Sequence, residues 1–119
     1  MERIMARLVY DTKTQPLTSG IRAVVQRARR MLYAADETEV ILQIAPGKRP
    51  EQLTLAGQVL DDGMPLEGAA VTLQGAASFI DKVTDEEGEF MIGALRPGTY
   101  GLQVDTPSLS IGVPPLEVE

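Results

Sequence analysis

The chain has 119 residues, of which 44% are apolar, and a formal net charge of −6. This length fits one domain with an extension, and the apolar content is sufficient for a buried core. Cysteine and histidine are absent, which excludes disulfides, thiolate chemistry and the usual general base at neutral pH. The sequence has no run of about 18 apolar residues and therefore predicts no membrane span.

Charge is distributed unevenly along the chain. Residues 1–50 contain nine Lys and Arg residues against five acids, a balance of +4. Residues 51–119 contain two basic residues against twelve acids, a balance of −10. Two parts of opposite charge can attract each other or a charged partner.

The first fifty residues predict a strand, a helix and a second strand. Residues 4–10 are mostly apolar and predict a strand, and a polar linker runs from Asp11 to Gly20. Between Ser19 and Tyr33 the apolar residues recur with the spacing of one helical face, which predicts an amphipathic, arginine-rich α-helix. The apolar stripe of this helix consists of Ile21, Val24, Val25, Ala28, Met31 and Leu32. Residues 38–45 alternate and predict a strand.

The segment Pro46–Pro50 predicts an internal boundary, because helices and central strands do not continue through proline. Residues 1–50 would then form an N-terminal strand–helix–strand segment, and residues 51–119 a β-sandwich.

Residues 51–119 have the pattern of short strands separated by Gly, Pro and Asp turns. Glycine follows two acids at both Gly63 and Gly88, where a turn requires positive φ. Pro114 and Pro115 predict the end of the last strand, with residues 116–119 as a tail. The predicted strands are 53–60, 70–73, 79–83, 89–92, 99–104 and 108–113. The fold class expected is mainly β, an aligned antiparallel sandwich with one N-terminal amphipathic helix.

Four motifs in residues 53–113 resemble the carboxypeptidase regulatory-like domain, an Ig-like or prealbumin-like sandwich of about seven strands. The motifs are Gly57-Gln58-Val59, Pro65-Leu66-Glu67-Gly68-Ala69-Ala70-Val71, Thr84-Asp85-Glu86-Glu87-Gly88-Glu89-Phe90 and Leu95-Arg96-Pro97-Gly98-Thr99-Tyr100. The resemblance implies that Phe90 enters the core and that Tyr100 forms a tyrosine corner with nearby backbone. This domain takes its name from its position behind a peptidase catalytic domain, which is not present in these residues.

The N-terminal part resembles small bacterial proteins associated with the regulation of extracytoplasmic-function sigma factors. The motifs are Leu8-Val9-Tyr10-Asp11, Gly20-Ile21-Arg22, Arg29-Arg30-Met31-Leu32-Tyr33 and Val40-Ile41-Leu42-Gln43-Ile44. The implication for function is one of context only.

The sequence predicts no catalytic, cofactor-binding or metal-binding residue. Its five acids between Asp81 and Glu89 could supply oxygen ligands for calcium, but they lack the spacing of an EF-hand loop and are better explained as a solvated hairpin turn. No histidine, Gly-x-Ser-x-Gly or Ser-x-x-Lys motif supports nucleophilic catalysis. No phosphate-binding glycine loop is visible.

The arginines of the predicted helix are the candidate partner-binding residues: Arg22, Arg27, Arg29 and Arg30. They could neutralise phosphates, but the net charge of −6 and the lack of stacking aromatics argue against nucleic acid. The helix could instead pack its apolar stripe on the sandwich, or offer both faces to a partner protein. The other surface that could bind a partner is an exposed edge of the sandwich that accepts an added strand.

These observations favour a non-enzymatic protein–protein interaction module that acts in regulation within a bacterial cytoplasmic complex. The segment Met1–Arg7 is charged and lacks a signal-peptide core, which supports the cytoplasm. The alternative is a secreted or surface structural or adhesive sandwich, and a hydrolase is a third hypothesis. The partner would be another protein, without a cofactor, and the oligomeric state is left open.

Overall fold

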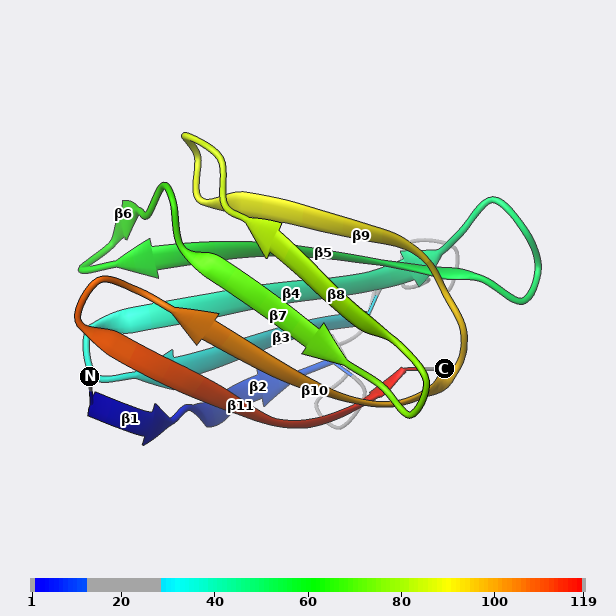
Figure 1. The fold of residues 1–119 in the computed structure, drawn as a ribbon, viewed down its shortest axis with the longest axis horizontal. Coiled ribbons are helices and arrows are strands. Elements are labelled where there is room, and N and C mark those ends of the chain that lie inside the picture. The colour runs from blue at the N-terminus through cyan, green and yellow to red at the C-terminus, as the bar shows by residue number, and fades with distance from the viewer. Residues whose placement is uncertain (1, 13–28, 119) are drawn as a thin grey trace, which may run out of the picture.

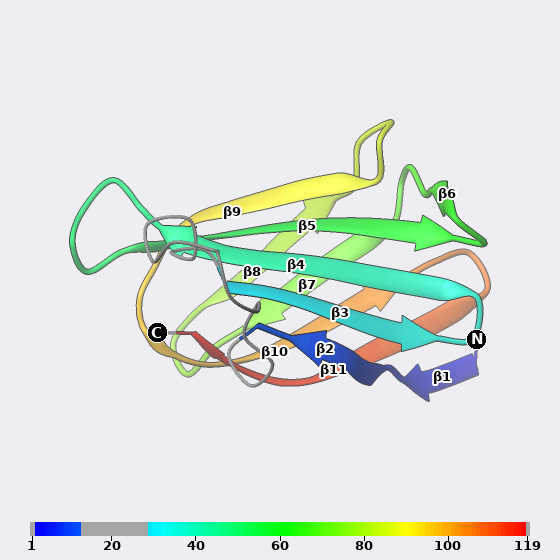
Figure 2. The ribbon, with the colours of Figure 1, turned by 180° about the vertical axis from the view of Figure 1, so that it is seen from behind.

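The computed structural model describes residues 2–12 and 29–118, and in these residues every regular element is a strand. The strands form two sheets that lie face to face (Figures 1 and 2). The strands are β1 (Glu2–Met5), β2 (Arg7–Asp11), β3 (Arg29–Ala35), β4 (Thr38–Pro46), β5 (Leu53–Asp61), β6 (Met64–Pro65), β7 (Ala70–Gln74), β8 (Phe79–Val83), β9 (Glu89–Leu95), β10 (Gly98–Asp105) and β11 (Leu109–Val118).

The first sheet has the order β1-β11-β10-β7-β8, and the second has the order β2-β3-β4-β5-β6, with β9 also paired to β5. All pairs are antiparallel except β1 with β11, which run parallel. The expected antiparallel sandwich is therefore confirmed.

The core lies between the sheets and is mainly aliphatic. Alternate residues of each strand point inward, as the period of a β-strand requires. On β4 these are Val40, Leu42 and Ile44, and on β10 they are Tyr100, Leu102 and Val104. The alternation predicted from the sequence for residues 38–45 is confirmed.

The predicted helix is wrong over residues 29–33, which lie in β3. This strand pairs with β4 through seven consecutive residues, from Arg29 opposite Ile44 to Ala35 opposite Thr38. Met31 is buried and Leu32 half-buried on the opposite face of the sheet, whereas the helical stripe placed both on one face. The apolar run fits both periods, and pairing with β4 decides in favour of the strand. The rest of the predicted helix, residues 19–28, lies outside the described residues.

The single strand predicted for residues 4–10 is two strands in different sheets. Ala6 is 4% exposed, and its N–H donates to the carbonyl of Gly112 at 2.8 Å. The chain passes here from β1, beside β11, to β2, beside β3. The small side chain of Ala6 allows the chain to pass through the packed edge of the sandwich.

The last strand continues through the two prolines that were predicted to end it. The register of β11 against β10 shifts by one residue between Leu102–Val113 and Tyr100–Leu116, which is a β-bulge at Pro114 and Pro115. On its other side β11 pairs with β1 only as far as Gly112. Proline is tolerated at a bulge and where no neighbour requires its missing N–H, so Leu116 and Val118 still reach the core.

The turn predictions at glycine are confirmed. Asp62 and Gly63 connect β5 to β6 with φ of 53° and 79°, which suits a two-residue hairpin. Gly88 has φ of 74°, and a Cβ there would stand 2.5 Å from the carbonyl oxygen of Val59.

The segment Pro46–Pro50 joins two neighbouring strands of one sheet. β4 and β5 pair along their whole length, from Pro46 opposite Leu53 to Thr38 opposite Asp61. Strands from both sides of residue 50 therefore share the second sheet, and β1 joins the first. The division into residues 1–50 and 51–119 stays a prediction about how the chain is organised.

Candidate interaction surfaces

The structure places two of the four candidate arginines, Arg29 and Arg30, at the start of β3. Arg22 and Arg27 lie outside the described residues. As neighbours on a strand, Arg29 and Arg30 point to opposite faces of the second sheet. They therefore have different surroundings and different roles.

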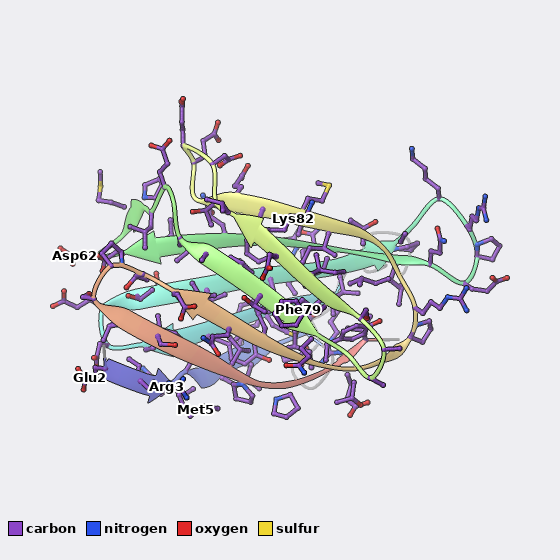
Figure 3. The ribbon with its side chains drawn as sticks, viewed as in Figure 1. Glu2, Arg3, Met5, Asp62, Phe79 and Lys82 are labelled. Atoms are coloured by element: carbon purple, nitrogen blue, oxygen red, sulfur yellow. The ribbon has the colours of Figure 1, made fainter. Side chains whose placement is uncertain are left out.

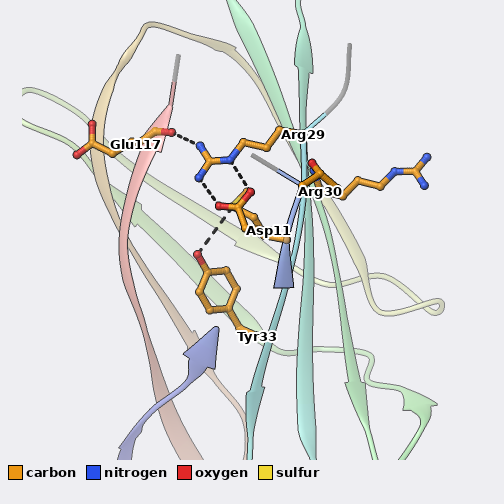
Figure 4. A network of polar contacts seen from close by, with 7 residues as sticks. Asp11, Arg29, Arg30, Tyr33 and Glu117 are labelled. Carbon is orange, nitrogen blue, oxygen red and sulfur yellow. Dashed lines mark hydrogen bonds and ion pairs between the residues drawn. The ribbon is translucent and has the colours of Figure 1, made fainter. Parts of the chain in front are cut away.

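Arg29 connects the two sheets (Figure 4). Its Nε donates to Oδ1 of Asp11 at 3.0 Å and its Nη2 to Oδ2 at 2.6 Å, a bidentate ion pair between β3 and β2. Its Nη1 donates to the carbonyl oxygen of Glu117 on β11 at 2.6 Å. The side chains of Asp11 and Arg29 are 5% and 20% exposed. These contacts assign Arg29 to the structure of the sandwich.

Tyr33 lies beneath this ion pair. Its ring is buried between the sheets, and its hydroxyl points towards the Asp11 carboxylate (Figure 4). Burial raises the pKa of the Tyr33 phenol above its ordinary value of 10.0. The charge of Asp11 raises the pKa further, and the charge of Arg29 lowers it. Tyr33 is therefore held neutral as part of the core.

Arg30, by contrast, is exposed on the outer face of the second sheet. Through the cross-strand register it lies in one row with Gln43, Ala56 and Met91. The Arg30 side chain is therefore open to solvent on this face.

The same outer face contains a shallow hollow of about 370 Å³ over β4, β5 and β9. Its outward side chains come from two neighbouring rows of the sheet, and Asp85 stands at its margin. The rows consist of Ile41, Gln58 and Glu89, and of Gln43, Ala56 and Met91. The small side chain of Ala56 leaves room between larger neighbours. The hollow can receive an apolar group that has a basic group beside it.

A second exposed surface lies on β8, at an edge of the first sheet. Phe79 is 63% exposed and Val83 is 66% exposed. They share the outer face of the strand with Asp81 between them. Figure 3 marks Phe79 and Lys82 on this strand.

The sequence predicted this strand with its bounds, but it did not predict its exposure. The alternation of Phe79, Asp81 and Val83 with Ile80 and Lys82 indicates two faces of a strand. Only the order of strands shows that β8 has a single neighbour in the described part of the chain.

The acidic residues of the β8–β9 connection form a turn. Oδ1 of Asp85 accepts hydrogen bonds from the N–H groups of Glu87 and Glu89, both at 2.9 Å, and the carbonyl of Asp85 accepts the N–H of Gly88 at 2.9 Å. Within residues 2–12 and 29–118, no group of three or more acids is close enough to hold a metal ion. The hydrogen bonds of Asp85 fit the hairpin-turn interpretation of these acids.

The two aromatic residues of the sandwich motifs have structural roles. Phe90 is 6% exposed and packs over Gly57 on the neighbouring strand. The hydroxyl of Tyr100 donates to the carbonyl of Arg96 at 2.8 Å, which confirms the predicted tyrosine corner. The motif residues thus serve turns and core.

The fold and these sites define a small antiparallel β-sandwich with exposed apolar surface. The family model of the carboxypeptidase regulatory-like domain matches residues 54–118, more than half of the chain. The chain belongs to this family, which is a family of non-catalytic domains. Searches of curated proteins and of solved structures found no match. The match begins at residue 54, so the resemblance of the N-terminal part to sigma-factor-associated proteins stays a prediction.

In the part of the chain that the structure describes, no helix has the length and apolar character needed to cross a membrane.

Proposed function

We propose that this protein is a non-enzymatic protein-binding module that acts in a regulatory complex of the bacterial cytoplasm. The observation that carries the proposal is the exposed apolar edge of β8, where Phe79 and Val83 present large side chains to solvent on the same face. Removing such surface from water provides the driving force of most protein association. The membership in a non-catalytic family supports a role in binding.

The outer face of the second sheet supports the same function. Met91 is 63% exposed beside the hollow, with the carboxylate of Glu89 nearby and Arg30 in the row across the sheet. An apolar centre with charges around it is the usual composition of a protein interface. Arg22, Arg27 and Arg30 remain candidates for contact with an acidic partner.

The cytoplasmic location rests on composition. The absence of cysteine fits a reducing compartment. Cell fractionation of the native host tests this part of the proposal. Recovery with the envelope or the medium would favour the alternative, a secreted or surface structural module.

Affinity purification from the native host, with the full chain as bait, tests the binding function. We expect a partner that the wild type retains and that Phe79→Thr loses. Met64→Thr is the matched control, because Met64 is 67% exposed on β6, which belongs to the other sheet. Equal recovery with wild type and Phe79→Thr would contradict the role of the β8 edge.

Charge reversal tests the arginine surface separately. Arg30→Glu should weaken partner recovery and leave the fold intact, because the Arg30 side chain is exposed. Arg29→Glu is unsuitable for this purpose, because it would place a carboxylate against the buried Asp11. Unchanged recovery with Arg30→Glu would exclude Arg30 from the interface.

A further inference from the structure

We infer that β8 is the binding site for an extended segment of a partner protein, which adds to the first sheet as an antiparallel strand. The segment would have the pattern apolar–acidic–basic–apolar–apolar. This inference rests on the proposed protein-binding function and names the partner chemistry that β8 would recognise. Strand addition at a sheet edge is a common mode of peptide recognition, in which backbone hydrogen bonds supply affinity and alternate side chains supply specificity.

The other sheet edges in the described part of the chain are poorer templates. The β2–β3 pairing is irregular between Leu8 and Tyr10, and β9 has an irregular register with positive φ at Ala94. β6 has only two residues, one of them Pro65. β1 is regular but begins with two exposed charges, Glu2 and Arg3. Bulges, prolines, short length and charges are the devices that protect edges from pairing.

Of these devices β8 has only the charges, which are those of Asp81 and Lys82. Its five residues contain neither glycine nor proline, and they pair with β7 in an uninterrupted register from Phe79–Gln74 to Val83–Ala70. Its outer face presents Phe79 and Val83, 63% and 66% exposed, on either side of Asp81. An added strand would cover these apolar side chains and satisfy the backbone groups of the edge.

Charge selects the partner sequence. On the outer face the Asp81 carboxylate accepts a hydrogen bond from the Thr72 hydroxyl at 3.2 Å, and as an ionised group it can accept more. The other face of β8 contains Ile80 and the exposed Lys82. An antiparallel segment therefore requires a basic residue opposite Asp81 and an acidic residue opposite Lys82. It requires apolar residues opposite the remaining three positions, because opposite charges and apolar pairs stabilise neighbouring strands.

A second copy of this chain does not fit the pattern. Two β8 strands related by a two-fold axis at Asp81 would place Phe79 opposite Val83 of the other copy. The same axis would place Asp81 opposite Asp81, and like charges directly opposite destabilise a strand pair. Lys82 would stand opposite Ile80. The surface is therefore suited to a different sequence.

A peptide titration tests the inference on the full chain, labelled with ¹⁵N. The probe is acetyl-Thr-Leu-Glu-Arg-Val-Val-Thr-amide, and the comparison is the charge-swapped acetyl-Thr-Leu-Lys-Glu-Val-Val-Thr-amide. We expect amide shifts confined to β8 and β7. Phe79→Thr should weaken binding about tenfold through loss of buried apolar area, and Met64→Thr should leave the Kd unchanged.

The charge swap is the decisive comparison. The double variant Asp81→Lys/Lys82→Glu should bind the first peptide about fivefold more weakly than wild type does, and should prefer the swapped peptide by a similar factor. Three results would overturn the strand-addition site. They are the absence of peptide binding by wild type, the same peptide preference in wild type and the double variant, and amide shifts that lie over β4, β5 and β9. A dimer that forms through β8 would also overturn it, as would a cross-link from β8 to residues 13–28 of the same chain.

Photo-cross-linking in the native host separates this inference from the proposed function. A photoreactive residue replaces Phe79 in one variant and Met91 in the other. Capture of one partner from position 79 supports strand addition when that partner's cross-linked segment has the predicted pattern. Capture from position 91 alone overturns strand addition and leaves the protein-binding function standing. Capture from neither position overturns both.

Discussion

Gly57 and Phe90 form a cross-strand pair between β5 and β9, in which the ring occupies the space that a side chain at residue 57 would fill. A Cβ at Gly57 would stand 2.2 Å from Cζ of Phe90, far inside van der Waals contact. The motif Gly57-Gln58-Val59 therefore requires glycine because of packing and not because of a turn.

We expect Gly57→Ala to lower the free energy of unfolding by about 1–3 kcal/mol, the usual cost of overpacking a core. Urea denaturation measures the change. Gly93→Ala is the control, because a Cβ at Gly93 on β9 meets no atom within 4 Å, and its effect should stay within about 0.5 kcal/mol. Phe90→Leu should reduce the cost of Gly57→Ala. Equal losses at Gly57 and Gly93 would show that the ring does not set the requirement.

Tyr33 predicts a specific dependence of stability on pH. Its pKa is raised in the folded protein, first by burial and then by Asp11, above the value of 10.0 that it has when exposed. The folded state therefore holds the phenolic proton more tightly than the unfolded state does. This contribution to stability is complete below pH 10.0 and is lost as the pH rises towards the folded pKa.

The measurement is the free energy of unfolding of wild type and Tyr33→Phe between pH 8 and pH 11. The stability of wild type relative to Tyr33→Phe should be constant up to about pH 10 and should then fall, because phenylalanine has no proton to lose. Comparing the proteins cancels the titration of lysines, which both retain. A constant difference across the whole range would contradict the raised pKa.

At the scale of elements, a strand was predictable wherever a local pattern agreed with its pairing. The bounds of β8 follow from its composition alone, and those of β4 and β5 are extended by a residue at one end. The turns at Gly63 and Gly88 follow from their glycines, which have positive φ in the structure. In these places the local preference and the tertiary structure favour the same conformation.

The elements that were predicted wrongly depend on partners distant in sequence. Residues 29–33 have an apolar spacing that fits a helix, and their pairing with β4 makes them a strand. Proline usually ends a strand, but β11 continues past Pro114 because β1 ends at Gly112 and a bulge accommodates the prolines opposite β10. A local pattern does not contain the position of a neighbouring strand.

The candidate binding residues also depend on strands that are distant in sequence. The sequence pattern places the arginines on one helix, but the strand β3 separates Arg29, bound to Asp11, from the exposed Arg30. The exposure of Phe79 depends on the edge position of β8. Composition could predict that catalytic chemistry lacked its usual residues, whereas the binding surfaces became visible only with the order of the strands.

For the molecule as a whole, the N-terminal part supplies much of the second sheet. β3 and β4 contribute core residues that face the first sheet, and β4 pairs with the whole of β5. In the described part of residues 1–50, the buried apolar side chains are Ala6, Met31, Tyr33, Ala35, Val40, Leu42 and Ile44. Without them, the inner faces of β10 and β11 would be open to water.

We therefore expect residues 51–119 alone to lack cooperative unfolding, although they include the whole family match. Thermal or urea denaturation followed by circular dichroism measures this, with the full chain as the control. The full chain should unfold in one transition, as small single domains usually do. A sharp transition for the fragment, at the same midpoint, would show that residues 51–119 are an independent domain.

The parallel pairing of β1 with β11 has a consequence for the synthesis of the protein on the ribosome. Glu2 pairs with Leu109 and Met5 with Gly112, so β1 is synthesised long before the strand that it pairs with. Until then β1 has no neighbour in its sheet, and closing so long a loop is slow because the entropy of the chain opposes it. The nascent protein would complete its first sheet only after β11 has left the exit tunnel.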